Sequence, residues 1–103
     1  MDSFSRISID QAHAFITQSN PVILDVRDAQ AFQTAAIAGA VHLSNDNIQR
    51  FLADTARDQP LLVYCYHGNS SQSAAQFLIE QGFAQVLSIE GGFEAWRQVY
   101  PIS

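Results

Sequence analysis

Short apolar runs alternate along the chain with longer stretches in which hydrophobic residues recur at helical spacing. Each apolar run predicts a short strand buried on both faces, and turn residues such as Pro21 and Pro60 mark the boundaries. The predicted strands lie at 22–24, 41–43, 61–65 and 84–89, and a shorter apolar alternation around Arg6 and Ile7 completes a five-stranded sheet.

The first helix has a clear start and stop. Ser8 and Gln11 form the pattern of a capping box, in which each side chain binds the backbone of the other residue. The pattern predicts a helix that runs to about Gln18, where the Ser-Asn-Pro stretch at 19–21 stops it.

Four later helices are predicted from capping residues and apolar spacing. Asp28 is predicted to cap a brief helical segment that carries Ala31 and Phe32 inward. In the other three, apolar residues recur every three or four positions, which is typical of a helix with one face in the core. These residues are Ile48, Phe51 and Leu52 in the first, Ala74, Ala75, Phe77, Leu78 and Ile79 in the second, and Phe93, Trp96 and Val99 in the third.

Strands and helices thus alternate along nearly the whole chain, and neighbouring strands joined through helices must lie parallel. The predicted fold class is α/β, a single domain over 1–103 with a central, mainly parallel five-stranded sheet flanked by helices on both faces. In open sheets of this kind, ligands bind beyond the carboxyl ends of the strands. We expect the segments 25–27, 42–45 and 65–70 to converge there.

Cys65, the only cysteine, falls where a predicted strand meets a loop and then a helix. Gly68 and Asn69 tolerate positive φ, and Ser70 or Ser71 is predicted to be the N-cap of the helix. Backbone N–H groups in such a loop, together with the helix N-terminus, form a cradle for an anion. Apolar burial raises the pKa of a thiol and aimed N–H donors lower it, and the donors act directly on the charge. We therefore predict that the pKa of Cys65 is lower than that of a free cysteine.

Composition narrows the range of partners and cofactors. The chain has ten acidic residues, five arginines and no lysine, and its net charge of -5 argues against binding to nucleic acid or to an anionic membrane. No stretch approaches the length of a membrane span and the amino terminus has no signal-peptide pattern, so a cytoplasmic location is expected. One cysteine and three scattered histidines give neither a disulfide nor a metal-ligand spacing. No metal and no cofactor are expected.

Other polar residues near the predicted sheet edge have weaker functional signals. His67 is close to Cys65 in sequence, but an exposed loop histidine is more often solvated than catalytic. His42 ends a predicted strand without an identifiable partner. Asp25 and Arg27 could assist an anionic substrate, although such side chains at a strand exit more often pair or bind loop amides. We treat Asp25 and Arg27 as candidate supporting residues only.

Three motifs occur in an order that resembles the rhodanese family. They are VILDVRD at 22–28, CYHGNSS at 65–71 and EGGFEAW at 90–96, and together they span most of the chain. The short single-domain layout and the cysteine loop look like the thiosulfate sulfurtransferases of that family. The resemblance implies a single rhodanese-like domain.

The resemblance also implies a reaction. Cys65 would be the nucleophile that takes the outer sulfur of thiosulfate as a persulfide. It would then pass this sulfur to cyanide or to a thiol acceptor such as thioredoxin. By the same resemblance, the residues that bind the persulfide or the anion through their amides are Tyr66, His67, Gly68, Asn69 and Ser70.

The chain departs from the family pattern at two points. Ala35 and Ala36 replace a Gly-His pair, which affects a structural match only. The active loop has no basic residue, whereas many relatives place arginine or lysine there. The resemblance therefore specifies the chemistry more closely than the substrate.

Two alternative functions fit parts of the sequence. Dual-specificity phosphatases share this fold and place an arginine six positions after the cysteine, where this chain has Ser71. Without that planar cation a phosphoryl group loses its main charge stabilisation. The other alternative is a domain that only recognises a partner, and the presence of Cys65 argues against it.

Overall fold

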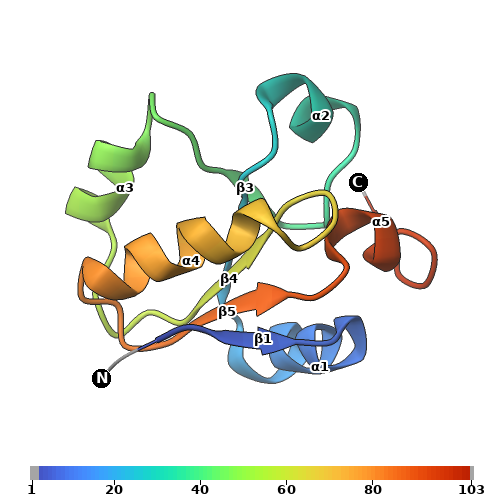
Figure 1. The fold of residues 1–103 in the computed structure, drawn as a ribbon, viewed down its shortest axis with the longest axis horizontal. Helices are drawn as coiled ribbons and strands as arrows, with labels where there is room; N and C mark the ends of the chain where they lie inside the picture. The colour runs from blue at the N-terminus through green and yellow to red at the C-terminus, as the bar shows by residue number, and fades with distance from the viewer. Residues whose placement is uncertain (1–2, 103) are drawn as a thin grey trace.

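The computed structural model describes residues 3–102, in which five strands and five helices alternate (Figure 1). The predicted domain over 1–103 also includes residues 1, 2 and 103, which lie outside the described part. In chain order the elements are β1 (Ser5–Ile7), α1 (Ile9–Ser19), β2 (Val22–Asp25), α2 (Ala29–Thr34), β3 (Val41–His42), α3 (Ile48–Asp54), β4 (Leu61–Tyr64), α4 (Ser70–Glu80), β5 (Val86–Ile89) and α5 (Gly92–Trp96).

The strands form one sheet in the order β1-β5-β4-β2-β3, and every pair of neighbours is parallel. The predicted α/β class with a mainly parallel five-stranded sheet is therefore confirmed. β4 is the central strand, and none of its four residues has any solvent-exposed surface. An apolar run without alternation is expected of a strand that is covered on both faces.

Helices cover both faces of the sheet, as predicted. Figure 1 shows α4 crossing one face, and the core on that face also includes residues of α3. The core on the opposite face is built with α1 and α5. The buried residues of the first core are Leu24, Leu43, Leu61, Val63, Ala75, Leu78, Ile79, Phe83 and Val86, and those of the second are Ala12, Ile23, Ile37, Leu62, Tyr64, Ile89, Phe93 and Trp96.

The predicted start signals of the first two helices are present. The Ser8 hydroxyl accepts a hydrogen bond from the Gln11 amide at 3.1 Å, and the Gln11 side chain accepts one from the Ser8 amide at 2.9 Å. This is the expected capping box. Asp28 caps α2 by accepting from the Ala31 amide at 2.8 Å.

Four side chains predicted to face the core belong to neither of the two core clusters. Phe77 is 39% exposed and Val99 is 59% exposed. Phe77 lies on the side of α4 that borders a surface groove, and Val99 lies beyond α5, where helical spacing no longer applies. Ala31 and Phe32 are only half-buried, because the short helix α2 stands at the rim of the sheet and has no buried residue.

No helix within residues 3–102 combines the length and the apolar character that are needed to cross a membrane.

Candidate active site

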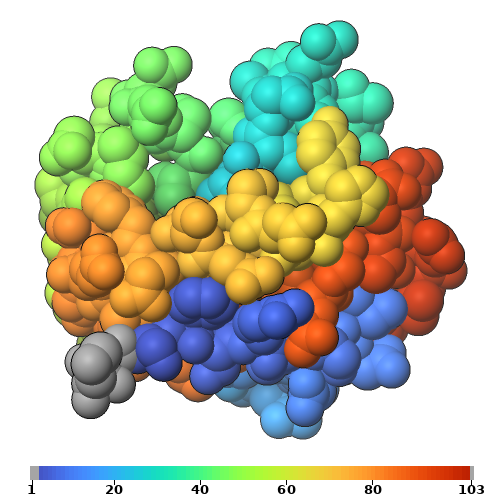
Figure 2. Space-filling model, viewed as in Figure 1, coloured from blue at the N-terminus to red at the C-terminus, as the bar shows by residue number. Residues whose placement is uncertain are grey.

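The loops after β2, β3 and β4 converge at one edge of the sheet, as predicted. Asp25, the last residue of β2, lies opposite His42 on one side and Tyr64 on the other. Cys65 follows Tyr64 directly and is 3% exposed. Figure 2 shows the loop after β4, in yellow, at the molecular surface between α2, in cyan, and α5, in red. The cysteine thus lies just beneath an accessible loop.

The Cys65 sulfur is held by the loop that follows it. The amides of Gly68 and Ser71 each donate a hydrogen bond to Sγ at 3.2 Å, and the Ser71 hydroxyl oxygen lies 3.4 Å from Sγ. Gly68 is itself buried and has a φ of 91°. That conformation favours glycine, and it redirects the chain after Gly68 so that the Ser71 amide also reaches the sulfur. The loop therefore surrounds Sγ with donors.

These contacts set the ionisation of the thiol. Burial raises the pKa of Cys65, but hydrogen bonds from the Ser71 and Ser70 hydroxyls and from the Ser71 and Gly68 amides outweigh burial and lower the pKa to about 7. The direction agrees with the one predicted from the sequence. At neutral pH a large part of Cys65 is a thiolate, which is the nucleophilic form of a cysteine.

The two serines after the loop do not have the predicted role. The N-cap of α4 is Asn69, which makes no side-chain capping bond, while Ser70 is the first helical residue. Ser71 has no exposed surface, and its hydroxyl also lies 2.9 Å from the hydroxyl of Ser88 in β5. Sequence reasoning missed both Ser71 and Ser88 as site residues. A signal existed for Ser88, which is a polar residue inside an otherwise apolar strand.

The start of α5, at 92–94, packs against the backbone of the cysteine loop and supports it. The Phe93 amide donates to the Cys65 carbonyl at 2.8 Å, and the Glu94 amide donates to the Tyr66 carbonyl at 3.0 Å. A Cβ atom on Gly92 would lie only 2.4 Å from the Cys65 carbonyl oxygen. The backbone of the loop and the start of α5 can approach this closely because residue 92 is glycine.

The outer part of the loop is open to solvent. Tyr66, His67, Asn69 and Ser70 are all exposed, and Tyr66 is 41% exposed. Within the described residues, the amides of these four residues donate to no protein acceptor. Donors without a partner at the mouth of the site leave room for an anion.

Asp25 and Arg27 form a buried ion pair instead of reaching the sulfur. Arg27 Nη2 lies 2.6 Å from Asp25 Oδ2, and the Asp25 carboxylate also accepts from the Arg27 Nε and backbone amide. Burial lowers the pKa of Arg27, but the hydrogen bonds and charge of Asp25 raise it above its ordinary value. The guanidinium packs 4.0 Å from the centre of the Phe93 ring. This geometry is that of two side chains that pair with each other, the alternative to assisting an anionic substrate.

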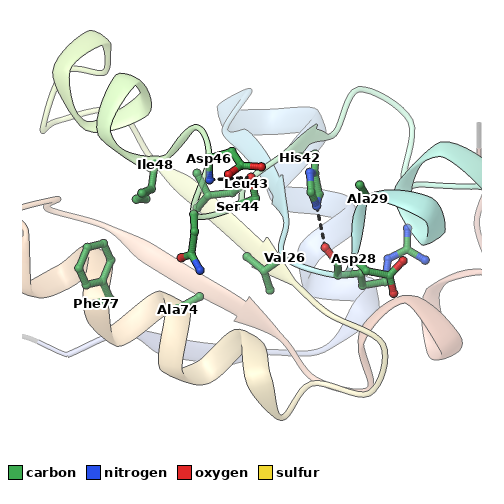
Figure 3. Close-up of a pocket in the computed structure, with 12 residues that line it drawn as sticks. Val26, Asp28, Ala29, His42, Leu43, Ser44, Asp46, Ile48, Ala74 and Phe77 are labelled. Carbon is green, nitrogen blue, oxygen red and sulfur yellow. Dashed lines mark hydrogen bonds between the residues drawn. The ribbon is translucent and has the colours of Figure 1, made fainter.

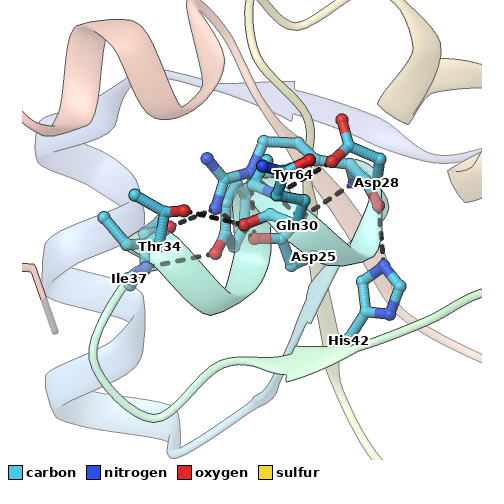
Figure 4. A network of polar contacts seen from close by, with 10 residues as sticks. Asp25, Asp28, Gln30, Thr34, Ile37, His42 and Tyr64 are labelled. Carbon is cyan, nitrogen blue, oxygen red and sulfur yellow. Dashed lines mark hydrogen bonds and ion pairs between the residues drawn. The ribbon is translucent and has the colours of Figure 1, made fainter.

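His42 joins the same network from β3. Its Nε2 lies 2.7 Å from the Arg27 carbonyl oxygen, and its ring stacks on Phe32 at 5.3 Å. Figure 4 shows Asp25 and Tyr64 close together, with His42 approaching from the neighbouring strand. The Tyr64 hydroxyl accepts a hydrogen bond from the Ile37 amide at 3.1 Å. The network ties the loop after β2, the segment before β3 and β3 itself to the central strand.

A groove of about 710 Å³ lies on the α3 and α4 side of this edge (Figure 3). Phe77 and Ala74 of α4 form one wall, and His42 and Asp28 lie on the other. Cys65 does not line the groove. No cluster of histidine, cysteine and carboxylate side chains that could hold a metal ion occurs among residues 3–102.

Fold and site together define an α/β domain built around one cysteine of lowered pKa, held at the carboxyl end of the central strand. Residues 8–99 match the profile of the Rhodanese-like domain, and the chain belongs to this family.

Individual relatives agree with this assignment. The chain is 52% identical over 101 residues to the thiosulfate sulfurtransferase GlpE of Pseudomonas savastanoi pv. phaseolicola, covering 98% of this chain and 94% of the relative. It is 50% identical to the thiosulfate sulfurtransferase GlpE of Pseudomonas putida, with 98% and 92% covered.

Solved structures share the fold. A rhodanese-related protein from Thermoplasma volcanium superposes with a TM-score of 0.82 at 26% identity, covering 97% of this chain and 98% of that one. A protein from Rhodopseudomonas palustris, described as a possible tyrosine phosphatase, also has a TM-score of 0.82 at 26% identity, with 97% and 85% covered.

Proposed function

We propose that this chain is a thiosulfate sulfurtransferase in which Cys65 carries the transferred sulfur. The Cys65 thiolate attacks the outer sulfur of thiosulfate, the sulfur–sulfur bond of thiosulfate breaks, and sulfite leaves with the electron pair. Cys65 then holds a persulfide. A nucleophilic acceptor attacks the outer sulfur of this persulfide, the new sulfur–sulfur bond breaks, and the thiolate is restored. The cycle needs no cofactor.

The observation that carries the proposal is the environment of Cys65 Sγ. Two backbone amides at 3.2 Å and a pKa lowered to about 7 provide a thiolate at neutral pH. About 50% identity to two thiosulfate sulfurtransferases over nearly the whole chain supports the choice of thiosulfate as donor.

Backbone amides, rather than a cationic side chain, would bind the anionic substrate. Arg27 lies two residues after the end of β2, at this edge of the sheet, but its positive charge is neutralised by the ion pair with Asp25. Among residues 3–102, the backbone amides of the exposed residues Tyr66, His67, Asn69 and Ser70 have no protein acceptor. In the proposed persulfide, these amides would stabilise the outer sulfur, as N–H groups stabilise an oxyanion.

The acceptor and the cellular location also belong to the proposal. Cyanide or a thiol acceptor such as thioredoxin could take the sulfur, because each is a nucleophile that can attack a persulfide. A cytoplasmic location fits this chemistry, since reducing conditions keep a lone cysteine as a free thiol.

Mass spectrometry of the intact protein after thiosulfate treatment tests the proposal. We expect the addition of one sulfur atom, located on the peptide that contains Cys65, and its removal when cyanide is added. Cys65→Ser keeps the size of the side chain and should take up no sulfur. Sulfur uptake by Cys65→Ser, or no uptake by the native chain, would contradict the proposal.

A further inference from the structure

A short chain of buried side chains leads from the Cys65 sulfur into the sheet. The Ser71 hydroxyl lies 3.4 Å from Sγ and 2.9 Å from the hydroxyl of Ser88. Ser71 is 0% exposed and Ser88 is 1% exposed, so no part of this chain is freely hydrated. Within residues 3–102, Ser88 Oγ has no hydrogen-bond partner other than Ser71.

The number of hydrogens in this chain depends on the state of the sulfur. Each hydroxyl can donate one hydrogen and accept others, and a thiol can also donate one. With a neutral thiol, three hydrogens share two contacts, and one of them is left without an acceptor in a buried place. With a thiolate, Ser88 donates to Ser71 and Ser71 donates to the sulfur, so that both hydrogens are used.

We propose that Ser88 is a positioning residue that holds the Ser71 hydroxyl in the orientation in which it donates to Cys65 Sγ. Because Ser88 needs an acceptor for its own hydrogen, it donates to Ser71 and turns the Ser71 hydrogen toward the sulfur. Aligned hydrogen bonds also strengthen each other in a buried site. The arrangement fits any state in which Sγ carries no hydrogen, which includes the thiolate and, if the proposed function holds, the persulfide.

Other titratable or charged groups around the cysteine do not replace this effect. On the β2 side the nearest are Asp25 and Arg27, which neutralise each other. Arg6 of β1, which lies opposite Ser88, is exposed to water, as are Glu90 after β5 and His67 in the loop. Glu94 of α5 pairs with Arg97 at 3.7 Å. The first two turns of α4 contain no charged residue.

The test is the pH dependence of iodoacetamide alkylation, which follows Cys65 as the sole thiol and does not require sulfur transfer. Ser88→Ala should raise the midpoint by roughly 0.5 to 1 pH unit, and Ser71→Ala should raise it further because it removes the direct donor. Since Ser88 acts through Ser71, the double variant should match Ser71→Ala alone. Ser73→Ala, which changes an exposed serine of the same helix, is the control and should leave the midpoint unchanged.

A purely structural role for Ser88 predicts a different pattern. Ser88→Ala would then lower the midpoint of urea unfolding without moving the alkylation midpoint. Ser88→Thr retains the hydroxyl and should restore the alkylation midpoint even if its added methyl group lowers stability. An unchanged midpoint in Ser88→Ala, or additive shifts in the double variant, would overturn the inference. If the native chain takes up no sulfur, the proposed function fails, and the alkylation result still decides the role of Ser88.

Discussion

Gly92→Ala should disrupt the cysteine loop without touching a side chain of the site. Gly92 has a φ of 59°, and an added Cβ would lie 2.4 Å from the Cys65 carbonyl oxygen and 2.6 Å from the Tyr66 carbonyl carbon. These are backbone atoms, and the first distance is about 1 Å shorter than ordinary contact. The loop and the start of α5 must therefore move apart.

The expected cost follows from the contacts that would be lost. A left-handed conformation costs an alanine about 1 to 2 kcal/mol. Separation of the loop from α5 also weakens two hydrogen bonds, from the Phe93 amide at 2.8 Å and from the Glu94 amide at 3.0 Å. Each bond contributes about 0.5 to 1.5 kcal/mol. The free energy of unfolding should fall by about 2 to 5 kcal/mol.

Gly39→Ala is the matched control. Gly39 also has a positive φ, of 84°, but an added Cβ there would meet no atom within 4 Å. It should cost only the conformational term of about 1 to 2 kcal/mol. Urea unfolding followed by the fluorescence of the single, buried Trp96 measures both variants. The alkylation midpoint of Cys65 should rise in Gly92→Ala alone. Equal stability and equal midpoints in the two variants would refute the reasoning.

Three further predictions concern charge. In the native chain the alkylation midpoint should lie near pH 7, below the ~8.5 of a free cysteine, and a midpoint at or above that of a cysteine peptide would contradict the anion cradle. Because the pKa of Cys65 is lower in the folded chain than in the unfolded chain, the native chain should lose stability relative to Cys65→Ser as pH falls from about 9 through 7. Arg27→Ala leaves the Asp25 carboxylate buried without its partner and should cost about 3 to 5 kcal/mol in urea unfolding, whereas normal stability with lost sulfur transfer would instead indicate a substrate-binding role. Aryl phosphates should not be hydrolysed by the native chain or by Ser71→Arg. Phosphate release that depends on Cys65 would show that Ser71, in the place of the phosphatase arginine, does not exclude phosphatase activity.

The sequence predicted the elements of the fold well because each has a local signal. Pro60 and the apolar run after it located β4, and the capping box of Ser8 and Gln11 located α1. The same spacing rule placed Phe77 and Val99 in the core, where they are not. Apolar spacing shows neither where a helix ends nor whether another element packs over a given face of the helix.

The candidate site was predicted only as far as its residues are close in sequence. The loop from Cys65 to Ser70 has a local pattern, and the structure places it at the expected sheet edge. Ser71 was taken for a helix cap because serine is common there. Its contact with Ser88 joins residues 17 positions apart, and no short-range pattern reports such a contact.

The distant supports of the cysteine loop connect chemistry with folding order. Ser88, Gly92 and Phe93 leave the ribosome well after Cys65, and until β5 and α5 have docked the loop lacks the contacts that hold it. In an incomplete or partly unfolded chain the loop lacks these supports, and we expect the pKa of Cys65 to lie closer to that of an ordinary cysteine, which is mostly protonated at neutral pH. We therefore expect the Cys65 thiol to become a strong nucleophile only when β5 and α5 have docked against its loop.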